Sequence, residues 1–525
     1  MTKATIQSEP SSDNSDVLPL TSISIKHKQV LATRRAGVLL HPTSLPGNRH
    51  NGTLGQHAFR FVDFLTECGM TVWQTLPLGP THSDASPYLC LSAHAGNPAL
   101  IDIDWLEHHQ LLAGQHECAP DQSYQEFVQI CLLQAHQVFC RQTDNELHFD
   151  YRDFINEHAN WLEDYALYTA LRIDNNGQSW DRWPQPLKDR DPKALKKART
   201  QLKDVIELIR FEQFVFFSQW QELKNYAHEH DVCLFGDIPI FVAYDSADVW
   251  AHRDFFLLDN AGYPSVVAGV PPDYFSKTGQ RWGNPHYHWD NLQADGFKWW
   301  LDRMRSQLDL FDLVRIDHFR GFESFWAIPA ESRVATHGEW IEAPGEALLN
   351  TLYETFGQLP LVAEDLGIIT KEVEALRLKF KMPGMKILQF AFSGESDNPY
   401  LPENHEKDSV VYTGTHDNDT TLSWYESLSQ IDKARVDSYF KQHKEFTSEP
   451  MPWPLIRCAL SSIAQLVILP MQDILGLGSG HRMNTPGVTK GNWHWRFEWN
   501  QISDDLPAHL SEILQDYHRV PDSHT

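Results

Sequence analysis

Eight short apolar segments recur along the chain, and segments with helical spacing lie between most of them. Apolar runs of roughly four to eight residues bounded by turn residues are typical of buried strands. The predicted strands cover residues 36–41, 71–78, 232–240, 313–319, 361–365, 385–392, 410–415 and 465–469. Strands that alternate with helices form parallel sheets, and eight such units are typical of a closed barrel. We therefore predict an α/β fold, a (β/α)8 TIM barrel. A doubly wound sheet is the alternative, but no GxGxxG motif follows the first strand and the chain has no Walker A motif.

Two long segments interrupt the alternation of strands and helices. Residues 99–230 have helical periodicity over most of their length, and residues 241–295 contain several Pro, Gly and Trp residues. We interpret both as insertions in loops at the C-terminal face of one catalytic domain, residues 34–525, and expect mostly helical subdomains there. Residues 1–33 are largely polar and have no apolar core of a signal peptide, so we predict a disordered N-terminal tail.

The composition excludes several classes of partner. The chain has 44 Lys and Arg against 70 Asp and Glu, a net charge of −26, which disfavours nucleic acids and anionic membranes. No apolar run approaches the roughly 20 residues that a membrane-spanning helix needs. The seven cysteines are scattered without a CxxC pair, which indicates a reducing compartment, and we expect a cytoplasmic protein. The 18 Trp residues suit sugar binding. The sequence does not indicate an oligomeric state.

The predicted strand at 313–319 carries two charged residues that a buried strand should not contain. Arg315 and Asp317 stand two positions apart, so their side chains point to the same face. An unpaired carboxylate inside a sheet is costly, and such a residue is usually paired or functional. One interpretation is a structural ion pair at the end of the strand. The other is a carboxylate kept ionised by a neighbouring guanidinium, which lowers its pKa, and available as a nucleophile.

Polar side chains occur at the carboxyl end of most predicted strands. Because the strands of a barrel are parallel, these ends meet at one mouth, where barrel enzymes have their active sites. Some of the carboxylates could instead cap the helices that follow, which is reasonable for Asp365 or Asp473. The residues at the strand ends are His41, Asp237, Asp317, His318, Glu364, Asp365, His416, Asp417, Gln472 and Asp473.

Two chemistries use clustered carboxylates on a barrel. A divalent metal would take His, Asp and Glu ligands, and cleavage of a glycoside would use one carboxylate as nucleophile and one protonated acid. The metal hypothesis is the weaker one, because the HxH pair formed by His286 and His288 lies in a Trp-rich loop and not at a strand end. We therefore expect no metal and no cofactor.

The chain resembles the 4-α-glucanotransferases of the amylomaltase type, glycoside hydrolase family 77. The resemblance extends from Arg35 to the C-terminal region. It rests on the motifs LLHPTSLPG (39–47), WQTLPLGPT (73–81), SPY (86–88), SAHAGNP (92–98), GDIPIFVAYDSADVW (236–250), GVPPDYFS (269–276), RWGNP (281–285), RIDHFRGF (315–322), EDLG (364–367), GTHDN (414–418) and MNTPG (483–487). One departure is Ser83, which stands where the family usually has an aromatic residue.

The resemblance implies a role for each strand-end residue that belongs to a motif. Asp317 would be the nucleophile, and Arg315 would keep it ionised. Glu364 would be the acid and base. Asp417, with His416 beside it, would bind hydroxyls of the distorted sugar and stabilise the transition state.

The resemblance also implies the substrate and its binding residues. Malto-oligosaccharides or other α-1,4-glucans would be donor and acceptor, and a glucan segment would move to the 4-hydroxyl of the acceptor by a retaining double displacement. An α-glucan hydrolase on the same fold is the alternative, and a metal-dependent barrel hydrolase is a further one. The loop 269–276 would close over the acceptor side. The residues implied to bind the glucan are Tyr88, Asp237, Trp282 and Asn484 at the donor sites, and Tyr274 and Phe275 in that loop.

Overall fold

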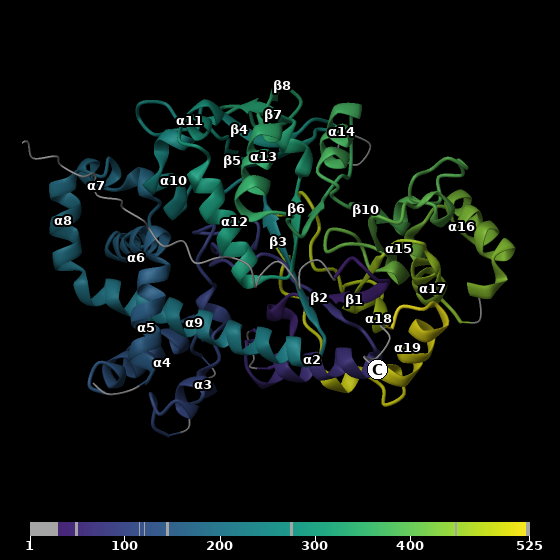
Figure 1. Ribbon diagram of the computed structural model, residues 1–525, viewed down its shortest axis with the longest axis horizontal. Coiled ribbons are helices and arrows are strands. Elements are labelled where there is room, and N and C mark those ends of the chain that lie inside the picture. The colour runs from purple at the N-terminus through teal and green to yellow at the C-terminus, as the bar shows by residue number, and fades with distance from the viewer. Residues whose placement is uncertain are drawn as a thin grey trace, which may run out of the picture.

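The computed structural model describes residues 30–47, 51–114, 116–119, 121–142, 146–272, 277–446 and 449–520. Its centre is a sheet of eight strands in the order β10-β11-β12-β1-β2-β3-β6-β9 (Figure 1). Every paired neighbour in this sheet runs parallel. The strands are β1 (Arg35–Leu39), β2 (Val72–Gln74), β3 (Cys233–Pro239), β6 (Leu313–Asp317), β9 (Leu361–Ala363), β10 (Gly384–Ile387), β11 (Ser409–Tyr412) and β12 (Leu466–Pro470). Each coincides with one of the eight predicted segments, so the predicted barrel is confirmed.

The sheet curves round into a barrel, and its two end strands meet. β1 pairs with β12, which joins the first strand of the chain to the last. β9 and β10 share no strand ladder, but the backbone N–H of Ala363 donates to the carbonyl of Pro383 at 2.9 Å. The barrel is therefore nearly closed, with one seam between β9 and β10.

Both faces of the barrel strands are buried, which explains why they are apolar without alternation. Side chains such as Phe235, Leu313 and Val410 fill the interior, while Leu234, Val314 and others between them pack outward against the helices. Val30 belongs to the interior cluster and is 1 % exposed.

The buried position of Val30 corrects one boundary of the predicted tail. Residues 30–33 form a turn next to the barrel, so they are not part of a disordered segment as predicted. Residues 1–29 lie outside the described part of the chain.

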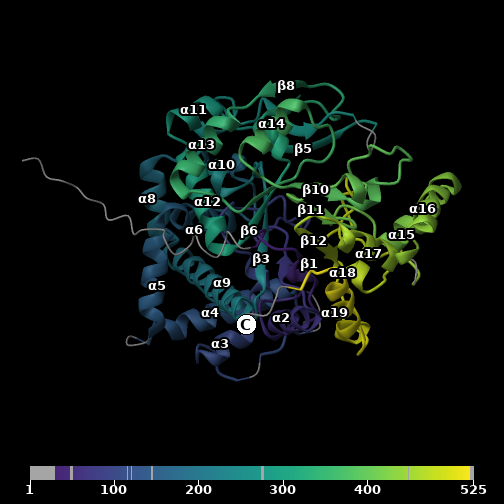
Figure 2. The same ribbon diagram turned by 45° about the vertical axis from the view of Figure 1, so that its right-hand side comes forward.

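Helices surround the barrel and form a large addition to one side (Figures 1 and 2). The addition lies between β2 and β3 and comprises α3 to α9, as the helical periodicity of residues 99–230 predicts. The helices are α2 (Gln56–Cys68), α3 (Ile103–His108), α4 (Tyr124–Phe139), α5 (Glu146–Glu157), α6 (Ala159–Asp174), α7 (Gln185–Lys188), α8 (Pro192–Gln201), α9 (Lys203–Glu229), α10 (Ala247–Ala251), α11 (Trp289–Ala294), α12 (Lys298–Leu310), α13 (Gly345–Phe356), α14 (Lys371–Lys379), α15 (Thr421–Ser427), α16 (Gln430–Gln442), α17 (Trp453–Ser461), α18 (Met471–Ile474) and α19 (Leu506–Asp516).

A second sheet of four antiparallel strands stands above the barrel mouth, and the sequence analysis missed it. Its order is β5 (Gln280–Pro285), β4 (Val266–Val270), β7 (Ser324–Pro329) and β8 (Glu339–Glu342). Two of its strands come from the segment 241–295, which we expected to be a mostly helical insertion, and two follow β6. The prediction failed because the strands are short and because β4 pairs with β7, which lies in a different connection of the barrel.

Among the helices of the described residues, none combines the length and the hydrophobicity that a membrane span requires.

Candidate active site

Arg315 lies at the centre of a buried ion-pair network at the carboxyl end of β6. Its Nη2 lies 2.9 Å from Oδ1 of Asp317, and its Nη1 donates to both carboxylate oxygens of Asp237 on β3, at 2.7 and 2.6 Å. The register of β3 on β6 places Asp237 directly opposite Arg315, which explains why the two side chains meet inside the barrel. One guanidinium thus binds two carboxylates, which its planar fork allows and an ammonium would not.

Tyr88 connects this network to the loop after β2. Its hydroxyl donates to Oδ2 of Asp237 at 2.8 Å. Its ring is stacked on that of His416, with centroids 5.1 Å apart, and His416 Nδ1 lies 3.5 Å from the hydroxyl. The structure therefore brings Tyr88, Asp237, Arg315 and His416 together with Asp317, as the resemblance implied.

Glu364 faces Asp317 across two neighbouring strands. Ile316 is paired with Ala363, so the next residue of each strand, Asp317 and Glu364, stands at the same height, and neighbouring strands lie about 4.8 Å apart. Glu364 Oε2 accepts a hydrogen bond from the backbone N–H of His318 at 2.8 Å, and Oε1 accepts one from Leu366 N–H at 3.1 Å. The chain turns at His318 with φ of 54°, a left-handed conformation that costs a residue with a side chain roughly 1–2 kcal/mol. The acid is therefore tied to the residue that follows Asp317.

The two carboxyl groups have different proton affinities. Burial raises the pKa of Glu364 to about 8, against the lowering effect of the Arg315 guanidinium, and the nearby charge of Asp317 adds a smaller rise. Burial also raises the pKa of Asp317 to about 6, against the opposing effect of Arg315. Arg315 lowers the pKa of Asp317, as we expected, but the rise caused by desolvation is larger. The order of the two values leaves Asp317 ionised and Glu364 protonated near neutral pH.

Asp417 lies beside this pair at the end of β11, on the solvent side. Its side chain is 48 % exposed, and Oδ1 lies 3.4 Å from His416 Nε2. Asn484 donates from Nδ2 to the same oxygen at 2.6 Å, and its backbone N–H donates to the His416 carbonyl at 3.1 Å. Asn484 thus contacts both residues of the His416–Asp417 dipeptide.

The antiparallel sheet supplies one wall of the mouth. Trp282 on β5 contacts His318 edge to face, with ring centroids 4.8 Å apart, and is only partly buried. Trp282 therefore lies next to the loop that follows Asp317. The predicted loop residues Tyr274 and Phe275 lie outside the described residues.

Two of the strand-end carboxylates have structural partners, as the alternative interpretation allowed. Asp473 accepts hydrogen bonds from the hydroxyls of Thr413 and Thr421 and from Thr421 N–H, at 2.6 to 2.7 Å. Asp365 binds the backbone of Met385 at 2.7 Å and Arg377 at 3.2 Å. Neither carboxylate is free for a substrate.

The histidine pair of the metal hypothesis does not join the carboxylates. His286 is fully buried beside Phe241 and Phe325, and His288 caps α11 by accepting from Asn291 N–H. Within the described ranges, no three His, Cys, Asp or Glu side chains are grouped as ligands of a metal ion.

Two residues that contribute to the site, Met385 and Tyr412, were not predicted from the sequence. Met385 on β10 places its sulfur 3.4 Å from Nε of Arg315, and Tyr412 on β11 donates its hydroxyl to Gln74 at 2.9 Å below the ion pairs. Met385 could have been predicted from the alternation of side chains along a strand, since Met385 and Ile387 are alternate residues of β10 and both point into the barrel.

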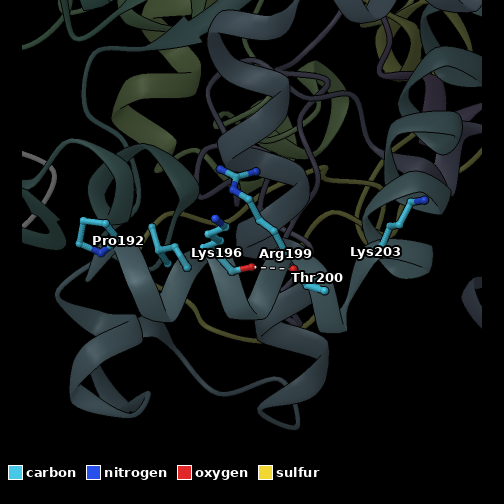
Figure 3. A pocket seen from close by; sticks show the side chains of 6 residues that line it. Pro192, Lys196, Arg199, Thr200 and Lys203 are labelled. Atoms are coloured by element: carbon cyan, nitrogen blue, oxygen red, sulfur yellow. Dashed lines mark hydrogen bonds between the residues drawn. The ribbon is translucent and has the colours of Figure 1, made fainter.

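A groove of about 520 Å3 elsewhere on the surface has no part in this site. It lies on α8 and the start of α9, at the outer edge of the helical addition (Figure 3). It is lined by Pro192, Leu195, Lys196, Arg199, Thr200 and Lys203. None of these residues was predicted to bind substrate, and the carboxylates that Arg199 contacts are Glu163 and Asp164 of the helical addition.

A (β/α)8 barrel with an ionised and a protonated carboxyl group facing each other at its mouth is typical of enzymes that cleave glycosidic bonds through a retaining mechanism. Comparison with known proteins agrees with this class. The family model described as 4-alpha-glucanotransferase matches residues 40–502.

Individual relatives extend the match over nearly the whole chain. The chain is 47 % identical to a 4-alpha-glucanotransferase from Synechocystis over 93 % of its own length and 99 % of the relative's. It is 46 % identical to the enzyme of that name from Thermus thermophilus, with the same coverage. Among solved structures it resembles an amylomaltase from Streptococcus agalactiae in complex with acarbose, at a TM-score of 0.88 and 36 % identity over 93 % of this chain and 99 % of that one.

The chain belongs to the 4-α-glucanotransferases of glycoside hydrolase family 77. Its activity is the transfer of α-1,4-glucan segments with retention of configuration.

Proposed function

We propose that Asp317 is the nucleophile of this transfer, that Glu364 is its general acid and base, and that Asp417 stabilises the transition state. The observation that carries the proposal is the pairing of β6 with β9, which places the first two carboxyl groups opposite each other. A retaining enzyme needs its two carboxyl groups about 5–5.5 Å apart, close enough for direct attack on the sugar.

The reaction begins with attack by an Asp317 carboxylate oxygen on the anomeric carbon of the donor. The bond from that carbon to the leaving oxygen breaks, and Glu364 gives its proton to the leaving oxygen. The donor segment is then an ester of Asp317. In the second half, the 4-hydroxyl of an acceptor loses its proton to Glu364 and attacks the same carbon, which releases Asp317. Two inversions give net retention.

The surrounding network suits the two protonation states that this sequence requires. Arg315 is 5 % exposed and holds Asp317 in place while also neutralising Asp237. The hydrogen bond from His318 N–H fixes the Glu364 carboxyl in place, and its lowering effect on the pKa is smaller than the rise caused by burial. Asp417 has a half-exposed side chain whose Oδ1 accepts a hydrogen bond from Asn484, which suits a carboxylate that binds sugar hydroxyls as the ring flattens.

We propose malto-oligosaccharides as donor and acceptor. The relative from Streptococcus agalactiae was solved in complex with acarbose, which supports a mouth shaped for a chain of sugar units. Tyr88, Asp237 and Asn484 would bind the donor unit next to the scissile bond. Trp282 would offer its ring to a neighbouring sugar, and Tyr274 and Phe275 would cover the acceptor.

The preference for transfer over hydrolysis must come from positioning. Water is far more concentrated than any acceptor hydroxyl, so a bound acceptor needs a large gain in effective concentration, together with exclusion of water from the ester. The hydrolase alternative predicts that maltotriose yields only shorter sugars. Transfer predicts glucose together with a ladder of longer oligomers.

Incubation of Asp317→Asn and Glu364→Gln variants with maltotriose tests the assignment. We expect no turnover from the first variant and a loss of about 10²- to 10⁴-fold in kcat from the second, the range typical of general acid and base catalysis. Asp473→Asn is the control, because its carboxylate binds only threonines of the fold in the contacts above. Wild-type turnover in Asp317→Asn would exclude Asp317 as nucleophile.

A further inference from the structure

We propose that Asp365 is a positioning residue: its carboxylate replaces a missing rung of the barrel ladder between β9 and β10 and so fixes Glu364 relative to Asp317. The proposal rests on the catalytic roles proposed above for those two residues. Asp365 follows Glu364 in the chain, and its carboxylate contacts Met385 N–H and the Arg377 guanidinium.

The hydrogen bonds across the seam follow the pattern of a parallel ladder for one step only. In such a ladder a residue donates to the partner before its opposite number and accepts from the partner after it. Ala363 stands opposite Gly384, and Ala363 N–H donates to the Pro383 carbonyl at 2.9 Å. The next bond should run from Met385 N–H to the Ala363 carbonyl. Instead Met385 N–H donates to Oδ1 of Asp365 at 2.7 Å.

Gly384 makes room for this carboxylate. A Cβ at position 384 would lie 2.2 Å from Oδ2 of Asp365, far inside contact distance. The absence of a side chain at the residue opposite Ala363 therefore lets Asp365 enter the seam. A buried backbone N–H without an acceptor is costly, so the substitution of a side-chain acceptor for a backbone one stabilises the end of β10.

The second oxygen of Asp365 is held from outside the barrel. Arg377 on α14 lies with Nε 3.2 Å from Oδ2, and its Nη1 donates to the Met382 carbonyl at 2.9 Å. Arg377 is 5 % exposed, and the Asp365 side chain is 11 % exposed. One buried arginine thus links the carboxylate to the segment that leads into β10. Glu406, 3.7 Å from Arg377 Nη2, is the remaining acid in this cluster.

The seam connects directly to both proposed catalytic groups. Asp365 follows Glu364 in the chain, so a fixed Asp365 fixes the backbone that carries the acid. Met385, whose N–H binds Asp365, places its sulfur 3.4 Å from Nε of Arg315, which in turn binds Asp317 at 2.9 Å. A change at Asp365 therefore reaches Glu364 through the chain and Asp317 through Met385 and Arg315.

Three variants test the role, each measured for kcat and KM on maltotriose and for thermal unfolding. Asp365→Ala removes the acceptor of Met385 N–H, and we expect kcat to fall about 10²-fold, the loss that a displacement of roughly 1 Å produces, with KM within about threefold because substrate binding is spared. Asp365→Asn keeps an oxygen for Met385 N–H but turns an amide NH2 toward Arg377, so its kcat should lie between that of the wild type and that of Asp365→Ala. Gly384→Ala leaves Asp365 in the chain but expels its carboxylate, and it should reproduce the kcat of Asp365→Ala.

The pH profile separates positioning from simple support of the fold. The charge of Asp365 raises the pKa of Glu364, so the alkaline limb of kcat/KM should move to lower pH in Asp365→Asn. The matched control is Asp312→Asn. Asp312 also accepts from a strand N–H, that of Leu234 at 2.8 Å, but at the opposite end of the barrel. This variant should lower the unfolding temperature and leave kcat and the alkaline limb unchanged.

The outcomes are distinct. If the Asp365 variants lose stability as Asp312→Asn does while kcat and the alkaline limb stay at wild-type values, Asp365 supports the fold only and the proposal is wrong. If the Asp365 variants are slow but Glu364→Gln is not, the assignment of Glu364 fails instead. Recovery of kcat in Asp365→Asn relative to Asp365→Ala, with Gly384→Ala matching the latter, supports the proposal.

Discussion

Arg315→Gln is the substitution that tests the electrostatics of the site most directly. The arginine lies 2.9 Å from Asp317 and within 2.7 Å of both Asp237 oxygens. Glutamine keeps most of the length of the side chain and removes the charge.

The ionised form of Asp317 is the nucleophile, so activity falls as the pH drops through the pKa of Asp317. Glu364 must be protonated, so activity also falls as the pH rises through the pKa of Glu364. Wild-type kcat/KM should therefore be bell-shaped, with limbs near pH values of about 6 and about 8.

The size of the effect follows from the contact that is lost. A neighbouring guanidinium lowers the pKa of an aspartate by about 1–3 units. Without Arg315, the acid limb should move from about 6 to roughly 7–9. At pH 7 the ionised fraction of Asp317 would fall from about nine tenths to between roughly one half and one hundredth. The loss of kcat/KM should be largest at low pH and should shrink as the pH rises.

The assay is release of glucose from maltotriose between pH 4.5 and 9.5 at constant ionic strength. Removal of Arg315 leaves the buried Asp237 unpaired, at a cost of about 3–5 kcal/mol in unfolding free energy, so each variant is first checked by circular dichroism. Arg303→Gln is the control: Arg303 is equally buried, but it binds the Ile240 carbonyl and the Tyr287 hydroxyl instead of a carboxylate. An acid limb that stays at the wild-type pH in folded Arg315→Gln would refute the reasoning.

Three further predictions follow from the same contacts. Asn484→Ala removes the 2.6 Å hydrogen bond to Asp417, and we expect kcat/KM to fall about 10- to 150-fold, since a hydrogen bond to a charged group contributes about 1.5–3 kcal/mol; an unchanged value would show that Asp417 needs no such support. Tyr88→Phe keeps the stacking on His416 but loses the hydrogen bond to Asp237. It should raise KM for maltotriose and change the unfolding temperature little, because the ring stays packed; an unaltered KM contradicts a role for Tyr88 at the donor site. Dialysis against EDTA should leave maltotriose turnover unchanged, measured beside a sample with added Mg2+; a loss that the metal restores would revive the metal hypothesis.

The barrel could be predicted from the sequence because its strands are buried on both faces. Continuous apolar runs such as 232–240 and 410–415 are distinct from the helical segments around them. The antiparallel sheet could not be predicted in the same way. β8 is mostly exposed and reads EWIE, and β4 pairs with β7 across β6, an association that no local pattern records.

The site was predictable to the extent that parallel strands bring their ends together. Asp237, Asp317 and Glu364 were each identified from their positions at strand ends and meet as expected. The balance of forces was not predictable. The sequence shows that Arg315 stands near Asp317, but burial, which determines the net direction of the pKa, exists only in the folded chain. Likewise, the bond from Met385 N–H to Asp365 has no sequence signature.

The pairing of β1 with β12 has a consequence for how the protein is synthesised. Arg35 and Leu466 are ladder partners, so the ring of strands cannot be completed until β12 has left the ribosome. Asp237 lies on β3, Asp317 lies on β6 and Glu364 follows β9. All three strands are synthesised long before β12. Contacts between such distant segments make folding slow. The strands made first therefore lack their final barrel partner until β12 is synthesised, and we expect the active site to form only after that step.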